Sequence, residues 1–162
     1  MRKTLILVAT VVAIALSSCT DKVIFDEKHN MSNGTWMRFE PETFEVEVKN
    51  VKDCYNIYFT LMVDTNVLKL SNVPLVVNLK DEEGSSRVFM SDVILKSKDG
   101  KITGNAVGDF VEYTAKAREY FYFNHPGIHQ FEIKNATQYY ELKGIASFGL
   151  KIEKSNMDIN IE

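Results

Sequence analysis

Apolar and polar side chains alternate along much of this chain, and a period of two is typical of β-strands with one face in a core. The segment from Thr43 to Lys49 alternates without interruption between apolar and mainly charged residues. Tyr55 to Val63 and Ala146 to Lys154 repeat the pattern. The predicted strands are 43–49, 55–63, 75–79, 87–95, 119–123, 128–134 and 146–154.

Turn-forming residues separate these segments, as hairpin connections require. Residues 81–84 (DEEG) and 125–127 (HPG) are turn sequences, and Asp99-Gly100 is the strongest hairpin signal in the chain. Residues 111–118 are expected to form one helical turn at most. We therefore expect an all-β fold, an antiparallel β-sandwich that is jelly-roll-like and has about eight strands.

The N-terminus has the pattern of a secretion signal. Arg2 and Lys3 precede an apolar run that is too short to span a bilayer, and the run ends in Ser18-Cys19. Small residues before a cysteine resemble a bacterial lipoprotein signal, which implies cleavage between Ser18 and Cys19. The resemblance also implies diacylglycerol on the Cys19 sulfur and an acyl chain such as palmitate on its amino group. The alternative is an ordinary secretory signal with a coincidental cysteine.

These features divide the chain into four parts. We expect a signal peptide at 1–18, a lipid-anchored tether at 19–35, a sandwich domain at 36–154 and a frayed tail at 155–162. The 144 residues left after cleavage are enough for one domain with its own core.

Charge narrows the range of partners. The formal charge of −3 becomes −5 once Arg2 and Lys3 are removed, and no basic patch stands out. Nucleic acid is therefore not an expected partner, and the overall attraction to anionic headgroups is weak. No second apolar stretch approaches a membrane span, so the lipid is the expected anchor. Thr20-Asp21-Lys22 lacks the acidic cluster that tends to mark surface export of such lipoproteins. We therefore expect the outer membrane, facing the periplasm.

Cysteine use is simple. Once Cys19 carries lipid, Cys54 has no second cysteine with which to form an intramolecular disulfide. Its place at the start of an apolar strand predicts a small buried side chain rather than a nucleophile.

No enzyme signature is present, and we expect neither catalysis nor a cofactor. His29, His125 and His129 do not make a metal site, because two histidines beside one turn do not complete a zinc sphere. We expect His125 and His129 to form hydrogen bonds, and His29 to lie in the tether. Glu45 and Glu47 share one strand face and are read as solvated, and the acidic run 81–83 as a charged turn.

Aromatic residues leave one alternative open. Six aromatic residues are candidates for an exposed sheet face that stacks on sugars: Trp36, Tyr58, Tyr120, Tyr122, Tyr139 and Tyr140. Packing in the core and at sheet edges is the favoured interpretation, with Tyr139 and Tyr140 the least suited to burial.

The order of motifs is similar to that of one family. Three segments carry the resemblance: Lys98 to Gly104, Pro126 to Ile133 and Leu142 to Lys154, the last of which is the most specific. They resemble the GldH family of gliding-motility lipoproteins from Bacteroidetes. The chain departs from that pattern at Lys101-Ile102 and Ile128-His129, where relatives tend to carry aromatic residues. The resemblance implies a non-catalytic envelope lipoprotein that supports gliding motility or type IX secretion through protein contacts. A glycan-binding envelope lipoprotein is the alternative.

Overall fold

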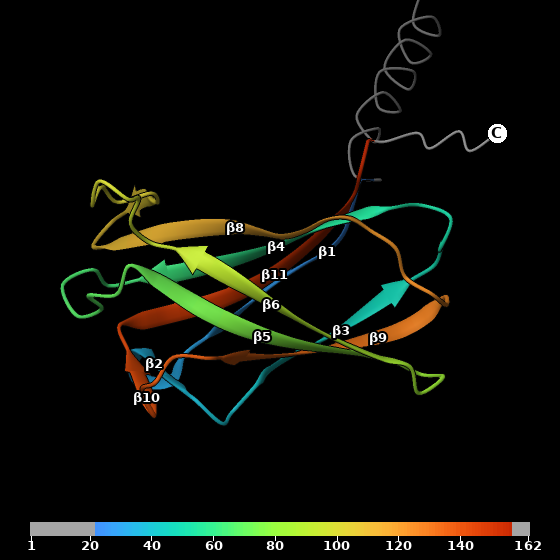
Figure 1. The fold of residues 1–162 in the computed structure, drawn as a ribbon, viewed down its shortest axis with the longest axis horizontal. Coiled ribbons are helices and arrows are strands. Elements are labelled where there is room, and N and C mark those ends of the chain that lie inside the picture. The colour runs from blue at the N-terminus through green and yellow to red at the C-terminus, as the bar shows by residue number, and fades with distance from the viewer. Residues whose placement is uncertain (1–21, 157–162) are drawn as a thin grey trace, which may run out of the picture.

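The computed structural model describes residues 22–156, and this part of the chain is all-β, as the alternation predicted (Figure 1). Two antiparallel sheets lie face to face and enclose one hydrophobic core. We call them sheet 1 and sheet 2. A third, two-stranded sheet, which we call the ribbon, closes one end of the sandwich.

The strand bounds are as follows. Sheet 1 contains, in spatial order, β1 (Val23–Asn30), β11 (Ile145–Lys154), β4 (Tyr55–Val63), β8 (Phe110–Phe121) and β7 (Asn105–Val107). Sheet 2 contains β3 (Glu42–Val48), β9 (Gly127–Asn135), β5 (Asn72–Asp81) and β6 (Ser86–Ile94). The ribbon pairs β2 (Thr35–Met37) with β10 (Glu141–Lys143), and the short 3₁₀ segment η2 (Ser32–Gly34) precedes β2.

The eight long strands follow the order of a jelly roll. Numbered 1 to 8 along the chain, they lie 1-8-3-6 in sheet 1 and 2-7-4-5 in sheet 2, which is the arrangement of two combined Greek keys. The described residues form eleven strands rather than about eight. The difference is the three-residue strands β2, β7 and β10, which are too short to show a period of two.

The alternating positions point inward as predicted. Phe44, Val46 and Val48 on β3 are at most 1% exposed. The side chain at the centre of the core is Phe148 on β11. Its ring centroid lies 4.9 Å from Trp36, 6.0 Å from Phe44 and 5.4 Å from Phe59. One ring thus touches the ribbon and both sheets.

The predicted tether is wrong over most of its length. Residues 23–30 form β1, which pairs with β11 from Val23 opposite Glu153 to Asn30 opposite Ser147. The sandwich therefore begins at residue 23 rather than at 36. The alternation pattern did not predict this strand because it lies at a sheet edge, where several polar residues are exposed and the register shifts between Val23 and Phe25.

The expected helical turn at 111–118 is also wrong. These residues lie inside β8 and pair with β4, where Tyr113 is opposite Leu61. Tyr113 and Ala117 point into the core while Thr114 and Lys116 are exposed. The period of two is present, but alanines mark its inner face too weakly for the pattern to stand out.

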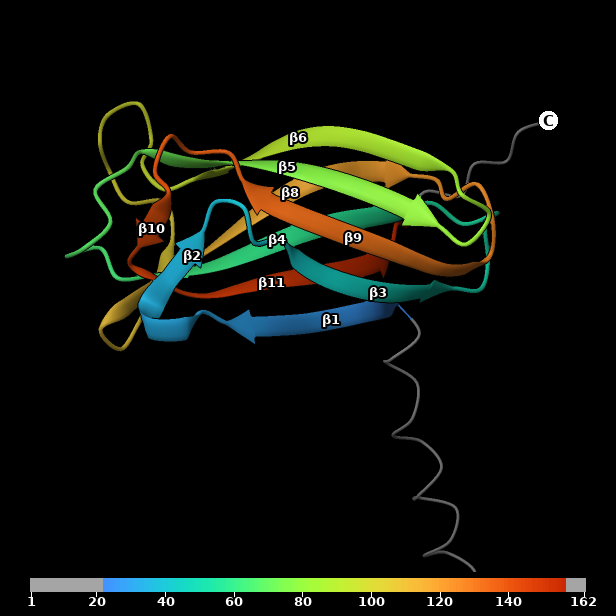
Figure 2. The same ribbon diagram turned by 90° about the horizontal axis from the view of Figure 1, so that it is seen from below.

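The sandwich has two distinct ends (Figure 2). The N-terminal end holds the start of β1, the end of β11 and the connections 49–54, 82–85 and 122–126. The opposite end, which we call the hairpin end, holds the ribbon and the loop 64–71.

Candidate functional site

The ribbon at the hairpin end is built on a buried pair. Trp36 on β2 is opposite Leu142 on β10, and each is 1% exposed. The Trp36 indole N–H donates to the carbonyl of Glu40 at 3.2 Å, and the Asn135 amide donates to the carbonyl of Trp36 at 3.3 Å. Trp36 is therefore a core residue, and its proposed place on an exposed binding face is wrong.

Two glycines close the ribbon against the sandwich. The Gly144 N–H donates to the Gly34 carbonyl at 2.8 Å, and both residues have positive φ. The Gly144 carbonyl accepts the N–H of Asp64 at 2.9 Å. A left-handed backbone without a side chain lets β10 turn directly into β11.

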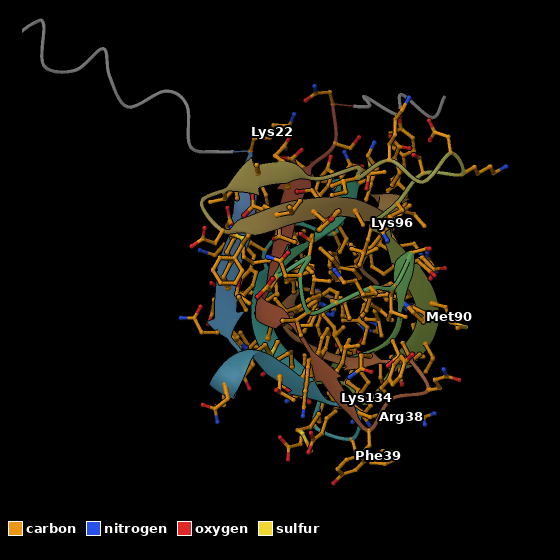
Figure 3. The ribbon with its side chains drawn as sticks, turned by 90° about the vertical axis from the view of Figure 1, so that its left-hand side faces the viewer. Lys22, Arg38, Phe39, Met90, Lys96 and Lys134 are labelled. Carbon is orange, nitrogen blue, oxygen red and sulfur yellow. The ribbon has the colours of Figure 1, made fainter. Side chains whose placement is uncertain are left out.

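Exposed aromatic rings lie at the tip of the ribbon. Phe39 is 68% exposed, Tyr140 60% and Tyr139 46%. The rings of Phe39 and Tyr140 are 5.9 Å apart, and the Arg38 guanidinium lies 5.7 Å from the Phe39 ring. Arg38 and Phe39 project from the edge of the hairpin end in Figure 3. We call Arg38, Phe39, Tyr139 and Tyr140 the aromatic tip.

Tyr139 and Tyr140 are exposed as the sequence suggested, and their role in binding stays a prediction. Phe39 was not among the sequence candidates. Its signal was present, because a phenylalanine between Arg38 and Glu40-Pro41 has polar or turn-forming neighbours and no alternating strand around it.

An acidic groove lies beside the aromatic tip. It has a volume of about 440 Å³, and its lining includes Trp36, Met37 and the three carboxylates of Glu40, Glu42 and Glu141. No lysine or arginine is among the described residues that line it. Glu42 is hydrogen-bonded to His29, and Glu141 is 3.3 Å from the Lys143 ammonium. The groove is suited to a cationic side chain.

Two further hollows flank β10. One, of about 670 Å³, lies between η2, Phe110 and Gly144, and the other, of about 310 Å³, lies between Val67 and Tyr139. Val67 is 53% exposed and borders both. The hairpin end therefore combines concave surface with exposed apolar side chains, which is the usual character of a contact surface.

All three histidines form hydrogen bonds, which was predicted for His125 and His129, whereas His29 was expected in the tether. His29 lies on β1, where its Nδ1 is 2.7 Å from Glu42 and its Nε2 is 3.1 Å from Glu27. Burial lowers the pKa of His29, but the hydrogen bonds and the charges of Glu42 and Glu27 outweigh burial and raise the pKa above 6.5. Its ring stacks on Phe44 with centroids 4.2 Å apart.

The other two histidines lie at the N-terminal end. His125 Nδ1 is 3.1 Å from Asp81 and its Nε2 is 3.3 Å from Glu83, while His129 Nε2 is 2.8 Å from the His125 carbonyl. The hydrogen bond from His125 is the main reason that the pKa of Asp81 is below its usual range. The acidic run is a charged turn as expected, with one histidine bound to it.

The remaining sequence candidates are placed as follows. Glu45 and Glu47 are exposed on the outer face of β3, and Cys54 is buried. Ser18 and Cys19, the predicted cleavage and lipidation residues, lie outside the described residues, as do the signal peptide and residues 157–162 of the predicted tail. Within residues 22–156 there is no cluster of three or more His, Cys, Asp or Glu side chains suited to a metal ion. No helix in the described range has the length and apolar character needed to cross a membrane.

Comparison with known proteins gives one clear result. The family model of the GldH lipoprotein matches residues 23–152, which is nearly the whole described sandwich. No curated protein matches the chain.

Among solved structures, two similarities are remote. The Aeromonas sobria serine protease in complex with its chaperone has a TM-score of 0.39 at 9% identity, covering 83% of this chain and 27% of that one. The serine protease of Aeromonas sobria has a TM-score of 0.30 at 10% identity, covering 82% and 27%. The chain thus spans about a quarter of the length of these proteins, and similarity at this level carries no functional argument.

Proposed function

Because this chain belongs to the GldH lipoprotein family, we propose that it is a non-catalytic component of the bacterial cell envelope that supports gliding motility or the type IX secretion machinery. In this proposal Cys19 carries the lipid anchor, and the protein acts by contact with another envelope protein. The absence of an acidic cluster in Thr20-Asp21-Lys22 favours the outer membrane, facing the periplasm.

The aromatic tip is the observation that supports protein contact most directly. Phe39 and Tyr140 are large, neighbouring and more than half exposed, and aromatic residues with arginine are enriched at the centres of protein interfaces. The acidic groove beside them is complementary to a lysine or arginine of the partner. The partner surface that fits best is therefore an apolar patch with a basic side chain next to it.

Glycan binding is less well supported. The sugar-stacking face expected from the sequence included Trp36, and that ring, the largest of the six proposed, is buried. Calorimetric titration of residues 22–162 with envelope polysaccharides tests this alternative, and millimolar binding that is lost in Tyr139→Ala would favour it.

Complementation of a deletion strain tests the proposed function. We expect the full chain to restore gliding, or in a non-gliding host the secretion of type IX cargo. The double variant Phe39→Ala with Tyr140→Ala is expected to restore it poorly at equal protein level. The matched control is Val88→Ala with Met90→Ala, which removes two apolar side chains of similar exposure from β6 and should complement fully. A deletion strain with normal motility, secretion and surface display would refute the proposal.

A further inference from the structure

The chain enters the sandwich very close to the proposed anchor. The Lys154 N–H donates to the Lys22 carbonyl at 2.7 Å, so the backbone is already part of the sandwich at residue 22, and β1 follows from Val23. Val23 follows Cys19 by four positions, so three residues lie between them. Even fully extended, the four steps from Cys19 to Val23 span about 14 Å. A tether that ended at residue 35 would have reached several times farther.

A cluster of lysines surrounds this entry point. The cluster consists of Lys22 just before β1, Lys49 and Lys52 in the loop 49–54, and Lys154 at the end of β11. Lys49 and Lys154 border the same hollow as Val23. Three carboxylates lie among these lysines: Glu47 is 3.6 Å from Lys49, Asp53 is 2.9 Å from Lys154, and Glu153 faces the charge of Lys22. Lys22 and Lys52 are exposed, and the four lysines exceed these three carboxylates by one positive charge. We call these four residues the lysine corner.

Tyr122 stands next to the lysine corner. It is 39% exposed, and its hydroxyl lies next to the Cys54 side chain in the loop 49–54. Tyrosine is suited to a membrane–water boundary because its ring is apolar while its hydroxyl stays hydrated.

The charges elsewhere are arranged differently. The turn 81–85 between β5 and β6 carries Asp81, Glu82 and Glu83 on the other side of the N-terminal end. The processed chain has a formal charge of −5. Because the acidic turn belongs to the same end, an anionic surface attracts the side of that end that carries the lysine corner and repels the side that carries the turn.

We propose that the sandwich stands end-on, with the lysine corner and Tyr122 against the phosphate and glycerol layer of the membrane and the hairpin end pointing away from it. The proposal rests on the lipid anchor of the proposed function. Strands of eight to ten residues separate the two ends, so the aromatic tip lies about 25 to 30 Å farther from the membrane than the lysine corner (Figure 2).

Fluorescence quenching in vesicles tests this orientation. The lipidated full-length protein is reconstituted in phosphatidylethanolamine–phosphatidylglycerol vesicles that contain phosphatidylcholine with a nitroxide on its headgroup. Tyr122→Trp places a reporter at the N-terminal end, and Tyr140→Trp places the matched reporter at the aromatic tip. The native Trp36 is common to both and lies at the hairpin end. We expect several-fold stronger quenching of Tyr122→Trp. Equal quenching of the two variants, or stronger quenching of Tyr140→Trp, would overturn the proposal.

The contribution of charge is tested in the Tyr122→Trp protein. Lys49→Glu with Lys52→Glu should reduce the quenching by about half or more. The control pair Lys98→Glu with Lys101→Glu, which changes two exposed lysines in the loop after β6, should leave it unchanged. An equal effect of both pairs would mean that overall charge, and not the lysine corner, governs the orientation. This assay needs no motility, so its outcome is independent of the complementation experiment.

Discussion

At the residue scale, His29 links the first strand to sheet 2. It lies on β1, its Nδ1–H donates to the Glu42 carboxylate of β3 at 2.7 Å, and its ring stacks on Phe44. Because its pKa in the folded protein is above 6.5, the protonated ring favours folding. This stabilisation is fully present below about pH 6.5 and is lost as the pH rises through the higher folded value.

We therefore expect the free energy of unfolding to fall between about pH 6 and pH 8 by more in the native protein than in His29→Gln. Urea denaturation at the two pH values measures this difference. An NMR titration of the His29 ring gives its pKa directly, and a value below 6.5 would contradict the prediction.

Gly144 is the residue at which a single methyl group should matter most. Its φ is +89°, and a Cβ there would lie 2.9 Å from the backbone nitrogen of Leu68. We expect Gly144→Ala to lower the free energy of unfolding by about 1–3 kcal/mol, because strain and a backbone clash add. Gly100→Ala is the control: it also has positive φ but meets no atom within 4 Å, so its loss should be smaller in the same denaturation experiment.

At the element scale, β1 shows the limit of what the alternation of apolar and polar residues can predict. The alternation predicted the inner faces of β3 and β4 correctly, because the buried positions of both strands are all apolar. In β1 only Ile24 and Phe25 pack against the core from consecutive positions, and the rest of the strand is mostly polar. Its existence depends on pairing with β11, more than a hundred residues later. No local pattern carries that information.

The role of β1 leads to a prediction about truncation. A soluble chain that begins at residue 22 should fold as a stable domain. One that begins at residue 31 should lose cooperative unfolding, because it exposes the edge of β11 and removes Phe25 from its contact with Phe44. Thermal unfolding followed by circular dichroism distinguishes the two. Equal midpoints would mean that β1 is dispensable, as the predicted tether implied.

At the scale of the whole molecule, the jelly roll was predictable from strand count and turn spacing, while the site was not. The exposure of Phe39 and the burial of Trp36 both follow from the pairing of β2 with β10, two three-residue strands about a hundred positions apart. Aromatic residues in short segments can be assigned to core or surface once that pairing is known.

The single core connects all three sheets through Phe148. We expect Phe148→Ala to cost about 3–5 kcal/mol, the usual range for removing a fully buried phenylalanine. Trp36 fluorescence should report the same transition as circular dichroism, because its ring packs on Phe148. Two separate transitions would show that the ribbon unfolds independently of the sandwich.

The direction of β1 also has a mechanical consequence. The strand runs from the N-terminal end toward the hairpin end, beside β11 along its full length. If a moving partner pulls on the hairpin end while the lipid holds Cys19, the force acts parallel to these strands. It then loads the β1–β11 hydrogen bonds together in shear, whereas a perpendicular force would break them one after another. β1, the edge strand that the alternation pattern did not predict, would then carry the pulling force between the partner and the membrane.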